Sequence, residues 1–254
     1  MLVKTTFQKP FLTANWRYLA MMNYRVDPKL LVKYIPPGVE LDFHNGETFL
    51  SLVAFLFLDT RILGLAIPRH RDFEEVNLRF YVRKRSADTW RRGVCFVREI
   101  VPRHAIAAVA RVFYGEPYLA LPMKSDIAHR DGGVQVEYSW RRRKKWEALR
   151  MSAAGNPVSL TAGSHEEFIT EHYWGYTKLR EGCSEYRVEH PRWKVWPASS
   201  ASLEAEIDDL YGGEFVEPLS ESPFSQFIAE GSHVQVRRRS DDPVLAEAIA
   251  EANN

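Results

Sequence analysis

The segment over residues 73–83 constrains the fold most strongly, because its two faces differ in polarity. Successive side chains of a β-strand point to opposite faces of the sheet. The residues of one face are apolar: Val76, Leu78, Phe80 and Val82. The residues of the other face carry polar groups: Glu75, Asn77, Arg79 and Tyr81. The polar face is either the solvated side of an antiparallel sheet or the lining of a cavity inside a curled sheet.

The charges on the polar face favour the cavity. At 3.3 Å per residue, Glu75 and Arg79 are expected to lie about 13 Å apart with Asn77 between them. Opposite charges at that separation suit a bound polar molecule better than a salt bridge. Because the planar guanidinium of Arg79 matches a carboxylate, we expect an anionic group of the ligand there.

Further strand signals recur along the whole chain. Asn45-Gly46 predicts a tight hairpin whose returning strand, over residues 48–58, is apolar on both faces and therefore central. Strands are also expected over residues 93–101, 134–141 and 233–239, with short helices over 164–173 and 202–210. Since no linker or repeat interrupts this pattern, we predict a single β-rich domain with few helices over residues 1–254.

Composition excludes several classes of function. The 254 residues carry a net charge of only +1, so no global field favours nucleic acid or an anionic membrane. The longest apolar run is far shorter than the roughly 20 residues of a membrane helix, and no secretory signal is evident. Cys95 and Cys183 lack the spacing of metal ligands. The two cysteines could form a disulfide, but nothing suggests a secreted disulfide framework, which favours a reducing, cytoplasmic location. We expect no metal and no cofactor.

Two basic runs leave a nucleic-acid hypothesis open. One run covers residues 141–145 between Trp140 and Trp146, and the other covers residues 237–239. Such runs can track phosphates while aromatic rings stack on bases. The alternative is a solvated strand end whose arginine stems lie over the indoles. The near-zero net charge favours the alternative, as does the absence of a nucleic-acid-binding motif.

A second candidate site lies at a sharp turn. The alanine-rich run over residues 105–110 predicts a helix that ends at Gly115, and Pro117 prevents its continuation. Glu116 and Tyr118 are therefore presented where the chain turns, a position at which residues are often functional. The alternative is a helix end with a packed tyrosine.

An ordered set of short motifs spans nearly the whole chain. They are Trp16, Ile35-Pro-Pro-Gly38, Val39-Glu-Leu-Asp42, Asn45-Gly46, the segment 73–82, Gly93-Val-Cys-Phe96, Ala110-Arg111, Pro117-Tyr118 and His190-Pro-Arg-Trp193. The set resembles the YqjF-like proteins, the domain-of-unknown-function family 2071, a branch of the acetoacetate decarboxylase-like superfamily. The resemblance implies an α+β fold: a cone-shaped, mostly antiparallel β-barrel with a few peripheral helices and a pocket inside.

The resemblance also implies a loss. The decarboxylases carry an arginine, then Gly-x-Pro-Lys, and the lysine forms a Schiff base with the substrate. Here Arg111 is followed by Gly115-Glu-Pro-Tyr118, so Tyr118 stands where the lysine would be. The fold is expected to transfer and the Schiff-base chemistry is not.

We therefore expect a small-molecule pocket for a ligand that bears a carbonyl or carboxylate. The candidates for acid/base catalysis are Glu75, Glu116 and Tyr118. The candidates for ligand binding are Asn77, Arg79, Arg111 and Lys124, with Lys124 as an alternative nucleophile. The competing class is a non-catalytic binding or structural protein, and nucleic-acid binding ranks third. A short alanine-rich helix from Asp242 onward is either a surface element or a contact in a homo-oligomer.

Overall fold

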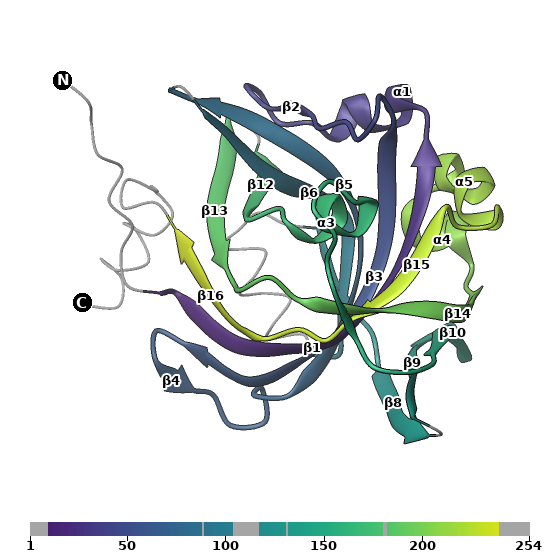
Figure 1. The fold of residues 1–254 in the computed structure, drawn as a ribbon. Coiled ribbons are helices and arrows are strands. Elements are labelled where there is room, and N and C mark those ends of the chain that lie inside the picture. The colour runs from purple at the N-terminus through teal and green to yellow at the C-terminus, as the bar shows by residue number, and fades with distance from the viewer. Residues whose placement is uncertain (1–9, 88, 104–116, 131, 180–181, 239–254) are drawn as a thin grey trace.

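The computed structural model describes residues 10–87, 89–103, 117–130, 132–179 and 182–238 (Figure 1). Its strands are β1 (Leu12–Val26), β2 (Glu40–Leu41), β3 (Thr48–Ile62), β4 (Leu65–Ala66), β5 (Phe73–Ser86), β6 (Thr89–Val101), β7 (Tyr118–Ala120), β8 (Met123–Arg130), β9 (Gly133–Arg142), β10 (Lys145–Ala153), β11 (Val158–Ser159), β12 (Trp174–Lys178), β13 (Cys183–Glu189), β14 (Lys194–Glu204), β15 (Ser225–Ala229) and β16 (His233–Arg238). Its helices are short: α1 (Pro28–Leu31), η1 (Val32–Tyr34), α3 (His165–Thr170), α4 (Ile207–Tyr211), η2 (Gly213–Phe215) and α5 (Val216–Ser220).

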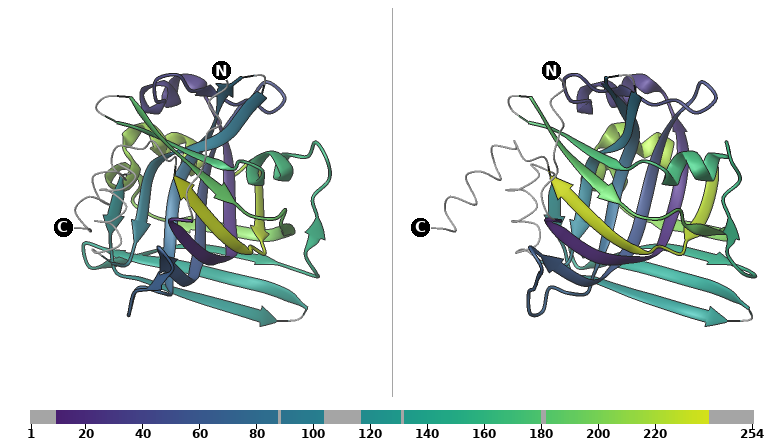
Figure 2. Two further views of the ribbon diagram at one scale, coloured as in Figure 1. Left: turned by 90° about the vertical axis from the view of Figure 1, so that its left-hand side faces the viewer. Right: turned by 60° about the vertical axis from the view of Figure 1, so that its left-hand side comes forward.

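The strands form one strongly curled sheet. Its order is β4-β3-β5-β6-β12-β13-β16-β1-β15-β14-β10-β9-β8, and β1 also pairs with β3. Among the described strands only β6–β12 and β6–β7 pair in parallel. Figure 2 shows β8, β9 and β10 as a layer that crosses the curled strands. The mostly antiparallel sheet with few helices is as predicted, but the strands are not spaced evenly round one axis as a regular barrel requires.

Strand β5 is covered on both faces. Val76, Leu78 and Phe80 pack into a core cluster that also contains residues of β9, β10, α4 and α5. On the other face Tyr81 packs with residues of β3 and with Phe168 of α3. Glu75 and Asn77 are 3% and 2% exposed, so the solvated-face interpretation of this strand is wrong.

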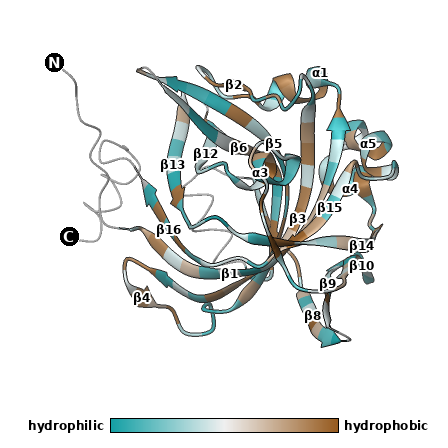
Figure 3. Cartoon of the chain, viewed as in Figure 1, coloured by the Kyte–Doolittle hydropathy of each residue, from teal (hydrophilic) through white to brown (hydrophobic). Residues whose placement is uncertain are grey.

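Strand β3 is the central strand that its sequence predicts. It pairs with β1 on one side and with β5 on the other, and its residues from Thr48 to Phe55 are buried. Figure 3 shows apolar residues along it. A strand apolar on both faces gains stability only when both faces are covered, which fixes its place between the two core clusters.

The predicted hairpin at Asn45-Gly46 is corrected in part. Both residues have positive φ, 52° and 82°, as a tight turn requires. The paired segment is a single bridge, His44 to Glu47, and β2 pairs with β5 instead of β3. The backbone N–H of Asp42 donates to the carbonyl of Tyr81 at 3.0 Å, which holds residues 40–42 along β5.

Two predicted helices differ in extent. The helix expected over residues 202–210 is α4, because residues up to Glu204 are taken into the β10–β14 ladder. The helix that Ser164 caps ends at Thr170, short of the expected Tyr173. The predicted helix over 105–115 and the tail helix from Asp242 lie outside the described residues. In the described part of the chain, no helix is long and apolar enough to cross a membrane.

The basic run between β9 and β10 is bound to acidic side chains. Arg142 and Arg143 form ion pairs with Asp209 at 2.7 and 2.8 Å, and Lys145 pairs with Glu206 at 3.1 Å. The guanidinium of Arg141 lies 5.8 Å from the ring centroid of Trp146. Three basic side chains of this run are thus paired with carboxylates.

Candidate functional site

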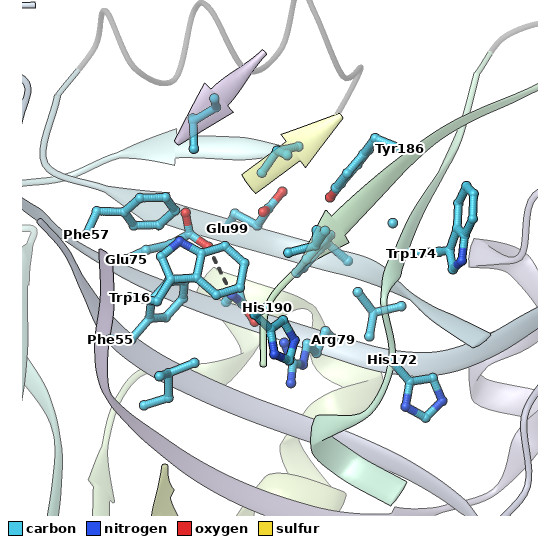
Figure 4. Close-up of a pocket in the computed structure, with 18 of the residues that line it drawn as sticks. Trp16, Phe55, Phe57, Glu75, Arg79, Glu99, His172, Trp174, Tyr186 and His190 are labelled. Carbon is cyan, nitrogen blue, oxygen red and sulfur yellow. Dashed lines mark hydrogen bonds between the residues drawn. The ribbon is translucent and has the colours of Figure 1, made fainter. Parts of the chain in front are cut away.

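A cavity opens within the curl of the sheet, on the polar face of β5 (Figure 4). Its empty volume is about 820 Å³, counted out to the solvent at its mouth. The polar residues of its wall are Glu75, Asn77, Arg79, Glu99, Tyr118, Thr170, His172, Tyr186 and His190. They come from β5, β6, β7, α3 and β13 and from the segments that follow α3 and β13. The curl thus brings together side chains that are far apart in sequence.

Glu75 is the centre of a hydrogen-bonded group. The amide Nδ2 of Asn77 donates to its Oε1 at 3.0 Å, and the hydroxyl of Tyr118 donates to its Oε2 at 3.1 Å. Strand β7 places Tyr118 there by pairing in parallel with β6, where Tyr118 stands opposite Glu99. The predicted approach of Tyr118 to the polar row of β5 is therefore observed.

Glu99 is a wall residue that sequence reasoning missed. It is 1% exposed and stands opposite Asn77 in the β5–β6 ladder. A register shift between Leu78 and Arg79 interrupts the alternation along β6. Because a bulge changes which side chains share a face, alternation alone could not assign Glu99 to the cavity. The sequence indicated only that Glu99 belongs to the strand expected over residues 93–101.

Arg79 is a cation without a counter-ion in the described structure. No described carboxylate forms an ion pair with it, and its buried Nε atom has no hydrogen-bond partner among the described residues. Its guanidinium lies 5.8 Å from the ring centroid of Tyr81. Arg79 and His190 project toward the same part of the cavity (Figure 4). Arg79 can therefore receive an anion from a ligand.

The histidines near Arg79 are neutral at physiological pH. Burial lowers the pKa of His190 to about 4, and the positive charge of Arg79 acts in the same direction. Burial likewise lowers the pKa of His172 to about 4, although its hydrogen bond to Asp42 opposes that shift. Among the described residues of the wall, Arg79 is thus the one that carries a positive charge.

Asp42 fixes the tautomer of His172. The Asp42 carboxylate lies 3.1 Å from His172 Nε2 and accepts a 2.6 Å hydrogen bond from Arg92. Burial raises the pKa of Asp42, but the hydrogen bonds from His172 and Arg92 outweigh it and hold that pKa below its ordinary value. Since an ionised carboxylate only accepts, the ring proton of neutral His172 is on Nε2. The buried Nδ1 is then an acceptor, and it has no partner among the described residues.

Aromatic side chains form much of the apolar part of the wall. The ring of Trp16 meets Phe55 and Phe57 edge-on, with centroid separations of 5.0 and 5.5 Å. The ring of His190 stacks on Trp193 at 4.0 Å. Trp16 and the motif His190–Trp193 were noted in the sequence only as family-like motifs, because nothing local indicates that segments so distant meet.

Lys124, another predicted site residue, is not among the described residues of this wall. Lys124 is exposed on β8, and its Nζ lies 4.8 Å from the ring centroid of Trp146 on β10. The prediction of Lys124 as a ligand-binding residue or alternative nucleophile required its side chain to turn inward, and this position on the crossing layer does not meet that condition. Arg111 and Glu116 lie outside the described residues.

The described residues contain no group of three or more potential metal ligands. His165 and His172 are seven residues apart in the sequence and have different surroundings. The ring of His165 packs 4.4 Å from that of Phe49, whereas His172 bonds Asp42. Their spacing reflects packing.

This architecture defines the class of the protein as acetoacetate decarboxylase-like in fold. It is similar to acetoacetate decarboxylase from Legionella pneumophila, with a TM-score of 0.60, 15% identity, and coverage of 94% of this chain and 88% of that one. It is also similar to an acetoacetate decarboxylase-like enzyme from Sphingomonas wittichii RW1, with a TM-score of 0.59, 13% identity and coverage of 92% and 94%. The enduracididine biosynthesis enzyme MppR, complexed with pyruvate, gives a TM-score of 0.56, 12% identity and coverage of 93% and 90%.

Within that class, the chain belongs to the domain-of-unknown-function family 2071, described as an uncharacterized conserved protein, whose family model matches residues 13–233. The uncharacterized protein YqjF of Bacillus subtilis (strain 168) is 28% identical over 204 residues, which cover 78% of this chain and 80% of that protein. The family resemblance seen in the sequence motifs is confirmed.

Proposed function

We propose that the cavity binds a short oxo acid and exchanges the proton next to its ketone by acid/base chemistry. The observation that carries the proposal is Arg79, a guanidinium on the cavity wall without an ion pair among the described residues. A guanidinium binds a carboxylate through two parallel hydrogen bonds. The pyruvate held by the enzyme MppR, which has a similar fold, supports this ligand class.

The group around Glu75 would supply the chemistry. With the carboxylate of the ligand on Arg79, the ketone and its neighbouring carbon lie along β5 toward Asn77 and Glu75. The Glu75 carboxylate takes a proton from that carbon, and the electron pair of the C–H bond moves into an enolate. The Tyr118 hydroxyl, which donates to Glu75 in the free protein, donates to the enolate oxygen instead. Return of a solvent-exchanged proton from Glu75 completes the exchange.

A phenol cannot form an imine, so position 118 cannot supply a Schiff base. The proposed proton exchange does not need one. The competing function is a binder that holds the same ligands without turning them over. Such a binder would hold the oxo acid as tightly as the proposed enzyme does, but it would not exchange the proton next to the ketone. Turnover, and not affinity, therefore separates the two functions.

Proton NMR of pyruvate in D2O tests the proposal. The protein should accelerate the loss of the methyl signal as deuterium replaces hydrogen, and Glu75→Gln should abolish that acceleration. Glu74→Gln is the matched control, because Glu74 is the preceding residue of β5 and its Oε1 accepts from Ser125 instead of facing the cavity group. Binding without exchange would reduce the function to ligand binding. Absence of both would refute the proposal.

A further inference from the structure

The aromatic wall of the cavity has no role in holding pyruvate. Pyruvate has a carboxylate, a ketone and one methyl group, which Arg79 and the Glu75 group can serve alone. Trp16, Phe55 and Phe57 nevertheless line the same cavity. We infer that these three side chains form a subsite for an aromatic substituent, so that the preferred ligand is an aryl-substituted 2-oxo acid. The inference deepens the proposed function and rests on it.

The strand register puts the aromatic wall beside the reacting group. Trp16 of β1 stands opposite Phe57 of β3, and Phe55 stands opposite Glu75 of β5. Arg79 lies four residues further along β5. Figure 4 shows Trp16, Phe55 and Phe57 gathered at the Glu75 end of the cavity. A ligand anchored on Arg79 that passes Glu75 therefore ends against the rings.

The chemistry of the wall favours a flat apolar group. Trp16 meets Phe55 and Phe57 edge-on, an arrangement that aromatic rings favour and that another ring can extend. Phe57 also stacks on Phe73 at 4.6 Å with an interplanar angle of 10°, which holds its ring in place. A rigid wall of this kind gains most from a planar substituent, because a flat ring covers it with little loss of conformational freedom.

Trp16 adds a polar preference to this subsite. Its indole Nε1 is buried and has no hydrogen-bond partner among the described residues. A buried donor without a partner is costly, and a ligand atom that accepts from it removes that cost. Aryl groups with a hydroxyl or a ring nitrogen are therefore expected to bind better than a plain phenyl group.

The geometry also gives the ring a mechanistic effect. In phenylpyruvate the carbon next to the ketone carries the ring, so placement of the ring on Trp16 and the carboxylate on Arg79 brackets that carbon beside Glu75. Conjugation with the ring stabilises the enolate, which forms when the proton moves from carbon to Glu75 and the electron pair of the C–H bond moves toward the oxygen that accepts from Tyr118. The aryl acids should accordingly exchange faster as well as bind more tightly.

Calorimetric titration of the intact chain with three probes tests the inference. The probes are pyruvate, phenylpyruvate and benzyl methyl ketone, which has the ring and ketone but no carboxylate. Phenylpyruvate should bind at least tenfold more tightly than pyruvate. Trp16→Leu should reduce this ratio at least fivefold, whereas Trp90→Leu, at an exposed tryptophan outside the cavity, should leave the ratio unchanged. Trp16→Phe serves if the leucine variant does not fold.

The outcomes separate the two proposals. Equal affinity for pyruvate and phenylpyruvate would overturn the aromatic subsite and leave the oxo-acid pocket intact. Binding of phenylpyruvate and benzyl methyl ketone with equal affinity would support the subsite and overturn the role of Arg79. A wild-type ratio that Trp16→Leu and Trp16→Phe both retain would overturn the assignment of the ring to Trp16. If none of the three probes binds, both proposals fall.

Discussion

The hydroxyl of Tyr118 on β7 donates a 3.1 Å hydrogen bond to Glu75 on β5, and both strands pair with β6. The sequence resemblance places Tyr118 where the relatives with Schiff-base chemistry carry a lysine. A phenol and a carboxylate can pass a proton, but neither can form an imine. The pair therefore argues for acid/base chemistry at this position of the fold.

Tyr118→Phe removes the hydroxyl and keeps the ring. We expect the fold to survive and the affinity for pyruvate to fall by about 0.5–1.5 kcal/mol, the usual range for one neutral hydrogen bond. The exchange rate should fall further, since the enolate oxygen loses its donor. Calorimetry and NMR exchange on the same sample measure the two effects. Unchanged affinity and rate would return Tyr118 to a packing role.

Borohydride reduction in the presence of pyruvate should leave the mass of the protein unchanged. An imine would be trapped as a stable adduct, but position 118 has no amine and Lys124 is exposed on β8, away from the cavity wall. Intact-mass spectrometry checks this. An adduct that maps to Lys124 would show that this lysine reaches the ligand after all.

His165 makes folding stability depend on pH. Burial lowers its pKa to about 4, and the nearby His44 acts in the same direction. Both ring nitrogens are buried without a partner among the described residues. The unfolded chain takes up a proton at His165 near pH 6.5, and the folded chain takes it up only near pH 4. The contribution of His165 to the unfolding free energy is therefore fully present above pH 6.5 and is lost as the pH falls toward 4.

His165→Phe should flatten that loss, because it keeps a ring against Phe49 and removes the titration. We expect the difference in unfolding free energy between pH 7 and pH 4.5 to shrink by about 1 kcal/mol, less than the full linkage value because the side chain is partly exposed. Some dependence of the unfolding free energy on pH should remain, because the pKa values of His172 and His190 are also lowered to about 4. Urea melts at both pH values measure the difference, and an unchanged slope would contradict the account.

Gly175 is required by the ring of Tyr186. A Cβ atom at Gly175 would lie 2.1 Å from Tyr186 Cζ, and the two residues are partners in the β12–β13 ladder. Gly175→Ala should destabilise the fold by about 1–3 kcal/mol, as overpacking does, and should displace a wall residue of the cavity. Adding Tyr186→Leu to Gly175→Ala should recover part of the loss in a thermal melt. No recovery would mean that the glycine serves another purpose.

Residues 73–83 show how much of the site can be predicted from the alternation of polar and apolar residues along a strand. It assigned Glu75, Asn77 and Arg79 to one face, because side-chain direction in a strand follows from the backbone. It could not decide whether that face is wet or buried, since this depends on β1, α3 and β13 closing over it. The curled sheet was predicted from the family resemblance. The position of β8 and of Lys124 on it depends on how the layer of β8, β9 and β10 crosses the other strands, and no local sequence pattern predicts that crossing.

Glu99 and His172 are two site residues that could not be predicted from the sequence. Glu99 reaches the cavity past a bulge, and a bulge resets the alternation on which strand faces are predicted. His172 is oriented by Asp42, a partner 130 residues away in the chain. Contacts of that range follow from topology, so they become visible only with the three-dimensional fold.

The central claim is that Arg79 recognises a carboxylate. The most direct measurement is the affinity of pyruvate and of its neutral amide, pyruvamide, for the wild-type protein and for Arg79→Met. Arg83→Met is the control, since Arg83 lies on the same strand and pairs with Glu40 outside the cavity. The wild type and the control should prefer the acid by at least tenfold, as a hydrogen bond to a charged group worth about 1.5–3 kcal/mol implies, and Arg79→Met should bind both equally. An Arg79→Met protein that still prefers pyruvate by tenfold would contradict the account.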